Sequence, residues 1–102
     1  MTDTIAAQFN PPHPGEFISQ TYLLPLQLSA RTLASALGVA ATSVTRICNG
    51  EARVTPEMAV RLEAVLGRGA ESWLRMQNAH DLWRVRATLN TDDLRRFDLD
   101  AT

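Results

Sequence analysis

Hydrophobic residues recur at every third or fourth position in five stretches of the chain, which is the spacing of helices that bury one face. In chain order these stretches are GEFISQTYLL, LQLSARTLASALG, VAATSVTRICNG, TPEMAVRLEAVLG and AESWLRMQNAHDLWRVRATL. No stretch shows the strict alternation of a half-buried strand, and the sequence contains no internal repeat or low-complexity run. The pattern therefore predicts an all-α fold of five helices, of which the last is the longest.

Residues typical of helix ends mark the boundaries of these stretches. Ser29 and Thr55 stand where N-cap residues are expected, before the second and fourth helices. Gly38 and Gly67 stand where these two helices end, because glycine tolerates the left-handed backbone of a helix C-terminus. Pro25 is expected to end the first helix, since proline disrupts a helix interior.

The helical pattern covers residues 13–89, which we expect to form one domain. Residues 1–12 are expected to be a flexible arm, and residues 90–102 an acidic tail with one possible helical turn. The chain has 102 residues, of which 45% are hydrophobic, and this suits a single core. It has no apolar run long enough to cross a membrane and no signal-peptide pattern at its start. The single cysteine, Cys48, excludes an intrachain disulfide, and we expect a cytoplasmic protein.

The second and third stretches meet at a glycine with the spacing that a helix-turn-helix unit requires. Gly38 can take the turn, and Ala34, four residues earlier, is small enough to let the two helices approach. The residues expected to face the core around this turn are Leu33, Leu37, Val39, Val44 and Ile47. The unit spans about residues 30–50, and the second helix of such a unit enters the major groove of DNA. The alternative is a pair of short helices that only pack together.

Small and hydroxylated residues and one arginine occupy the outward face of the third helix. Arg46 can donate two hydrogen bonds to guanine, which distinguish that base by about 1–3 kcal/mol. The residues expected to contact bases are Ala41, Thr42, Thr45 and Arg46. Phosphate contacts are expected from Arg31, Ser43 and Arg53.

The charge distribution supports a polyanionic partner although the net charge of the chain is −1. Residues 31–86 carry eight arginines against five acidic residues, a net charge of +3, between acidic ends. All ten basic residues are arginine, whose forked guanidinium suits phosphates and guanine. A basic centre between acidic ends can meet DNA with one surface and a basic protein with another.

Two apolar flanks run along the fifth helix, one suited to the chain's own core and the other to a second copy. The flank expected to form the dimer interface contains Trp73, Met76, His80 and Trp83. The adjoining flank contains Leu82, Val85 and Leu89. A homodimer would place two recognition helices about 34–36 Å apart, as a palindromic operator requires. The alternative is that both flanks are buried within one subunit.

Residues suited to catalysis or to binding a metal or cofactor are sparse. His13, Cys48 and His80 provide the only imidazoles and the only thiol, and they lack the spacing of metal ligands. The sequence has no glycine-rich phosphate loop and no pair of carboxylates suited to acid–base catalysis. We therefore expect neither an enzyme nor a cofactor.

Several motifs in succession resemble one known family. They are HPGE before the first helix, PL.LS before the second, LA..LGV at the turn, then NG, T.EMA.RL...LG and WL..Q..HDL. In this order the motifs look like those of the HigA/VapI group of antitoxins, within the Xre/Cro/C1-type helix-turn-helix family. The resemblance covers residue 13 to about residue 86 and implies a λ-repressor-like, five-helix DNA-binding domain with a long C-terminal helix. HPGE is interpreted as structural, with Pro14 and Gly15 starting the first helix.

The resemblance also implies a function. Such proteins are dimers that bind an operator upstream of their own operon and neutralise a HigB-type toxin, a small basic ribonuclease that cleaves messenger RNA. By the resemblance, residues 42–46 contact bases, and Arg31 and Arg53 contact the backbone. The loop GEARV is less basic than in many relatives, and the tail lies outside the shared pattern. Two alternatives are a regulator without a toxin and a protein that mainly masks a toxin. The acidic tail is either only solvated or a contact for the toxin, with Leu94, Phe97 and Leu99 as its candidate anchors.

Overall fold

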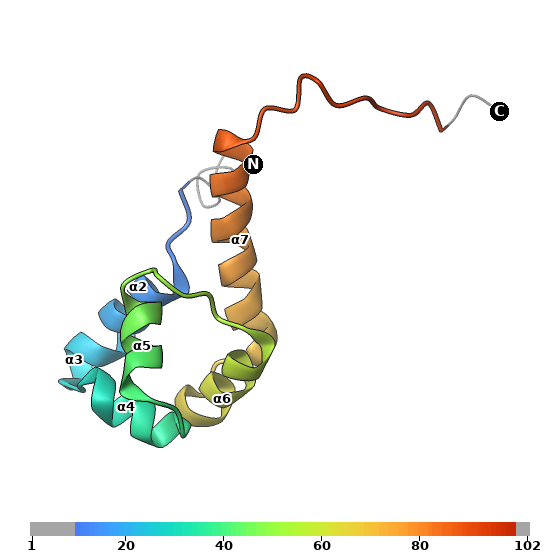
Figure 1. Ribbon diagram of the computed structural model, residues 1–102. Coiled ribbons are helices and arrows are strands. Elements are labelled where there is room, and N and C mark those ends of the chain that lie inside the picture. Colours follow the sequence, from blue (N-terminus) through green and yellow to red (C-terminus); the bar gives the residue numbers. More distant parts are fainter. Residues whose placement is uncertain (1–9, 100–102) are drawn as a thin grey trace.

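A computed structural model describes residues 10–99, which form five helices and no strand (Figure 1). The first helix has three consecutive segments: α2 (Pro14–Ile18), the π-helical η1 (Ser19–Leu23) and α3 (Leu24–Leu26). The others are α4 (Ala30–Leu37), α5 (Ala41–Cys48), α6 (Pro56–Leu66) and α7 (Ala70–Thr88). The predicted all-α fold is therefore confirmed. Most of the expected arm, residues 1–9, and the last three residues of the tail lie outside the described residues.

The core is made by residues from every helix and from the loop before α6. Its fully buried hydrophobic residues are Ile18, Leu33, Ala34, Leu37, Val44, Ile47, Val54, Ala59, Leu62 and Trp73. Burying one large apolar side chain of this kind contributes about 1.5–3 kcal/mol to folding. The C-terminal half of α7 extends beyond this body, and residues 89–99 continue away from it (Figure 1). The residues that pack the helix-turn-helix are thus buried as expected, except that Val39 is only partly buried.

The predicted helix ends are largely confirmed. The hydroxyl oxygens of Ser29 and Thr55 accept hydrogen bonds from backbone N–H groups one turn later, at 3.0 and 3.2 Å. Gly38 and Gly67 end α4 and α6 with φ of 74° and 87°, in the left-handed region that favours glycine. These ends depend on local chemistry, and local sequence therefore identifies them.

The expectation that Pro25 ends the first helix is wrong, because the helix continues to Leu26. Proline has no N–H, and its ring collides with the carbonyl four residues earlier in a regular α-helix. The π-helical turn η1 precedes it, and the Leu24 N–H bonds to the Ser19 carbonyl five residues earlier. A wider turn of this kind accommodates the proline ring. The helix ends only at Gln27, which has a left-handed φ of 55°.

The HPGE motif holds α2 against α5. His13 is the N-cap of α2, and its Nδ1 accepts a hydrogen bond of 2.9 Å from the Gly15 N–H. Gly15 lies directly against the C-terminal end of α5, where a Cβ would be 1.8 Å from the Ile47 carbonyl oxygen. The structural interpretation of this motif is confirmed, and the structure adds that α5 requires glycine at this position.

Residues before the expected domain start at residue 13 already contact the rest of the fold. Pro11 is buried, and its carbonyl oxygen lies 3.0 Å from His80 Nδ1 on α7. The rings of His13 and His80 meet edge to face at 5.1 Å. These contacts fasten the residues before α2 to α7.

Substituting Gly15 tests the contact between α2 and α5. Gly15→Ala should lower the free energy of unfolding by about 3 kcal/mol, because backbone must move to admit the methyl group. Gly69→Ala is the matched control, since its Cβ would meet only a side-chain oxygen at 3.6 Å; its cost should stay below about 1 kcal/mol. Chemical denaturation measures both, and equal losses would contradict the close contact.

The pKa of His13 gives the stability a defined pH dependence. Burial lowers this pKa below its usual value of about 6.5, and the nearby positive charges of His80 and Arg84 act in the same direction. The charge of Asp81 and a hydrogen bond with the Ala52 backbone oppose this shift only in part. The neutral ring is also the form whose Nδ1 can accept the Gly15 N–H.

The unfolding free energy should therefore be greatest above pH 6.5 and fall as the pH drops below it. In that range the unfolded chain binds a proton at residue 13 that the folded chain does not bind, a loss of at most about 1.4 kcal/mol per pH unit. His13→Asn keeps an N-cap acceptor and removes the titration. Chemical denaturation at pH 7.5 and 5.5 should show a larger decrease in the free energy of unfolding for the wild type than for this variant. Equal losses would exclude His13 as the source.

Candidate nucleic-acid interface

α5 presents a polar face because its other face is held in the core. Val44 and Ile47 are buried, and Ala41 and Cys48 are partly buried against the same cluster. Thr42, Thr45 and Arg46 are exposed, and Ser43 is partly exposed. The outward face expected from the sequence is thus present, except that Ala41 is half covered by the core.

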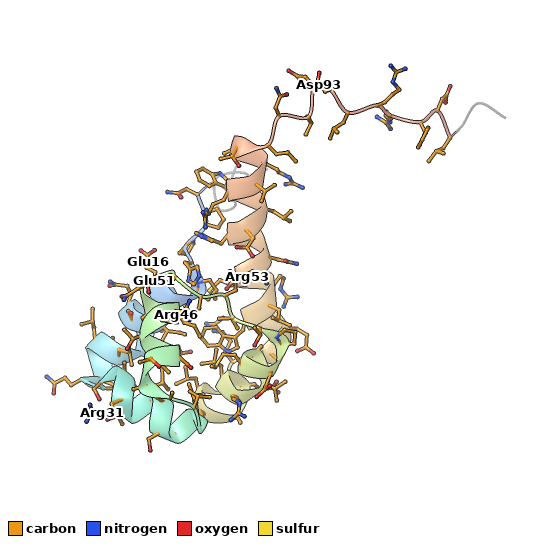
Figure 2. The ribbon with its side chains drawn as sticks, viewed as in Figure 1. Glu16, Arg31, Arg46, Glu51, Arg53 and Asp93 are labelled. Carbon is orange, nitrogen blue, oxygen red and sulfur yellow. The ribbon has the colours of Figure 1, made fainter. Side chains whose placement is uncertain are left out.

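A shallow hollow of about 230 Å³ lies beside this face and brings several of the expected DNA contacts together. Thr42, Ser43 and Arg46 of α5 line it, together with Arg53 from the loop that follows. Figure 2 shows Arg46 on α5, Arg53 beyond the end of this helix and Arg31 on α4 at the opposite end. Arg31 and Thr45 lie outside the hollow, and the Thr45 hydroxyl donates to the Ala41 carbonyl at 3.1 Å.

The expected arginines differ in how they are held. Within residues 10–99, the guanidinium groups of Arg31 and Arg46 make no ion pair and no hydrogen bond, although the Arg46 backbone carbonyl accepts from the Glu51 N–H at 2.8 Å. Arg53 is instead bound by Asp81 of α7, whose Oδ2 accepts from Nε at 2.8 Å and from Nη2 at 2.7 Å. No pattern in the sequence points to Asp81, since it lies 28 positions from Arg53.

Arg61 of α6 holds the turn between α4 and α5. Its Nη1 donates to the Leu37 carbonyl at 2.8 Å, and its Nη2 pairs with Glu57 Oε2 at 2.9 Å. The Leu37 carbonyl is among those left without a partner at the C-terminus of α4. Arg61 therefore stabilises the end of α4 and the direction in which α5 leaves the turn, a role that no local motif indicates.

The expected dimer interface on α7 requires a correction at Trp73. This side chain is 0% exposed in the single chain, and its Nε1 donates to the Arg68 carbonyl at 3.1 Å. The rings of Phe17 and Tyr22 pack against it. Trp73 thus belongs to the chain's own core, because it has no surface left for a second copy.

The other three residues of that expected interface lie nearer the surface. Met76 is partly buried against the core, His80 contacts the Pro11 carbonyl, and Trp83 is partly buried. The exposed hydrophobic residues of α7 and the position after it are Leu82, Val85 and Leu89, at 47, 49 and 57% exposure. The flank with Leu82, Val85 and Leu89 therefore offers more apolar surface to a partner than the flank that was expected to form the dimer interface.

Residues 10–99 contain no group of three or more side chains that could hold a metal ion. In the same range, no helix is both long enough and apolar enough to cross a membrane. The groups that line the hollow beside α5 include arginine and hydroxyl side chains, which can donate hydrogen bonds.

The chain matches the helix-turn-helix family over residues 20–73. It is 38% identical over 88 residues to the HTH-type transcriptional regulator YddM of Escherichia coli (strain K12), which covers 86% of this chain and 93% of YddM. The structure of antitoxin GraA is similar with a TM-score of 0.83 and 33% identity, covering 87% of this chain and 99% of GraA. The structure of the Pseudomonas aeruginosa antitoxin HigA with the higBA promoter has a TM-score of 0.73 and 31% identity, covering 76% of this chain and 84% of HigA.

Proposed function

The chain belongs to the helix-turn-helix family as a regulator and antitoxin of the HigA type, not an enzyme, and from this premise we propose its activity in two parts. As a homodimer it binds a palindromic operator upstream of its own operon and represses transcription. As an antitoxin it neutralises a HigB-like toxin, a small basic ribonuclease that cleaves messenger RNA.

The observation that carries the first part is the exposed face of α5 with its adjoining hollow. Arg46 lies there beside Thr42 and Ser43, and Arg53 stands at the end of the hollow. A guanidinium without a partner in the described chain has all its donors available for guanine O6 and N7. The antitoxin HigA of similar structure was solved with promoter DNA, which supports the same use of this face.

A homodimer is supported by the apolar residues that the single chain leaves exposed on α7. Leu82, Val85 and Leu89 are spaced so that they share one side of the helix. A second copy that covers them would also supply the second recognition helix for a palindrome. This assigns the dimer contact to the flank next to the one expected from the sequence, with Trp83 at its border.

The tail is the surface that we propose for a toxin. Leu94, Phe97 and Leu99 are 67, 79 and 83% exposed, and acidic side chains accompany them. Charge attracts a basic protein, and buried apolar anchors then give the complex its lifetime.

Removing Arg46 and removing Arg53 should affect operator binding differently. Arg46→Ala should relax specificity at one base pair of each half-site, with a discrimination loss of about 1–3 kcal/mol. Arg53→Ala should weaken binding to all sequences alike and reduce the salt slope by about one unit. Fluorescence anisotropy with operator and scrambled DNA across a salt series measures both.

Arg95→Ala, an exposed tail position, is the control for the loss of one positive charge and should change affinity less than about twofold. A footprint of two half-sites one helical turn apart would support the dimer. Equal loss for every sequence on removing Arg46 would contradict its role in reading bases, and no selective binding by the wild type would contradict the repressor.

Co-expression tests the antitoxin part. The chain should co-purify with a small basic protein encoded beside it and restore growth to cells that express that protein. Truncation after residue 89 should weaken the complex by at least about tenfold, the effect of losing one strong anchor, and leave operator binding unchanged. An unchanged complex would exclude the tail as the toxin contact. The absence of any such neighbour would identify the chain as a regulator without a toxin.

A further inference from the structure

One residue outside the helix-turn-helix unit acts on its DNA contacts. Asp81 lies in the middle of α7, yet its Oδ2 binds two nitrogens of Arg53, at 2.8 and 2.7 Å. Its Oδ1 accepts a hydrogen bond of 3.1 Å from Gln77 Nε2, one turn earlier on α7. Both carboxylate oxygens are therefore engaged, and the plane of the carboxylate is fixed.

Gln77 in turn fixes this arrangement from inside the protein. It is 1% exposed, and its Oε1 accepts a hydrogen bond of 2.8 Å from the Val54 N–H. Because the amide oxygen is used by the backbone, the amide nitrogen has to point to Asp81. Arg53 and Val54 are neighbours in the loop after α5, and both are held from α7. Asp81 binds the Arg53 side chain, and Gln77, one turn earlier, binds the Val54 backbone.

Arg53 stands between two hollows of the surface. One is the hollow beside Thr42, Ser43 and Arg46, and the other is an open groove of about 490 Å³ between this loop and α7. Its side chain is 61% exposed, so core packing alone does not fix its rotamer. The ion pair with Asp81 is the contact that does.

We propose that Asp81 is a positioning residue for DNA binding, which holds Arg53 in the orientation that receives a phosphate of the operator. This rests on the proposed function of the α5 surface. With Nε and Nη2 held on Asp81 Oδ2, the Nη1 edge of the guanidinium stays available for a phosphate oxygen. Holding the side chain in advance removes part of the conformational entropy that binding would otherwise cost.

The negative charge of Asp81 acts in the opposite direction, because it repels phosphates. The Asp81 side chain is 28% exposed and that of Arg53 61%, so solvent reaches the pair and salt screens this repulsion at the distances of neighbouring phosphates. The orientation of Arg53 does not depend on salt in this way. The two effects therefore separate when affinity is measured at several salt concentrations.

A double-mutant cycle on operator affinity tests the proposal, with wild type, Asp81→Asn, Arg53→Ala and the double variant. Asp81→Asn should weaken binding about fivefold when Arg53 is present and less than about twofold when it is absent, the pattern of coupled residues. The loss should persist at high salt. Glu57→Gln is the matched control, since it removes the other arginine ion pair with the same change of charge, and it should show no such dependence on Arg53.

Arg53→Lys is a second variant that leaves Asp81 unchanged. It keeps the charge but lacks the fork, so it should lose nearly as much affinity as Arg53→Ala if orientation matters. Equal effects of Asp81→Asn with and without Arg53, no effect at all, or tighter binding would each overturn the proposal. Binding of no DNA by the wild type would instead defeat the proposed function itself, and this inference with it.

Discussion

The close approach of α2 to the end of α5 is the constraint on which the exposed face of α5 depends. At Gly15 there is no room for a Cβ against the Ile47 carbonyl, so the backbones of the two helices touch. This contact sets the depth at which α5 sits, and the burial of Val44 and Ile47 sets its rotation. Once depth and rotation are fixed, Thr42, Thr45 and Arg46 have to face outward. The surface that we propose for DNA binding is thus a consequence of how the hidden side of α5 is packed.

The arginines of the central region divide into those that build the fold and those that remain free. Arg61 holds the end of α4, and Arg68 lies over the Phe17 ring at 4.7 Å. The guanidinium groups of Arg31 and Arg46 have no partner within residues 10–99, and Arg53 is intermediate because Asp81 binds only part of its guanidinium. A count of charges cannot make this division. The count of eight arginines in residues 31–86 therefore overstates the number of guanidinium groups available to a polyanion.

Sequence reasoning succeeded where structure is decided locally. The caps at Ser29 and Thr55 and the glycine ends at Gly38 and Gly67 follow from the chemistry of single residues. It failed at Pro25, because a π-helical turn one step earlier accommodates the proline ring. It also failed at Trp73, since the apolar pattern of a long helix does not say which flank meets the chain's own core. Contacts such as that of Gly15 with α5 join distant segments and leave no local pattern.

One signal for the missed residues was present in the sequence. Gln77 lies on the flank of α7 that also carries Trp73 and His80, where a polar side chain needs a specific partner. That partner is the backbone of Val54, and the remaining amide hydrogen bond leads to Asp81. A polar residue on a buried flank thus indicates a hydrogen bond to another segment, although the sequence does not identify that segment.

Three regions of α7 have different contacts, because the helix is long and only its first part packs in the core. Its first turns bury Trp73, its middle holds the loop after α5 through Gln77 and Asp81, and its end carries the exposed Leu82 and Val85. A rigid helix connects these regions, because each turn is bonded to the next. The residue that orients Arg53 therefore lies within one turn of the surface offered to a second copy. The proposed dimer contact and the residue proposed to position a DNA contact are thus adjacent on a single helix, and a change in how α7 is covered would reach the Asp81 carboxylate over a distance of about one helical turn.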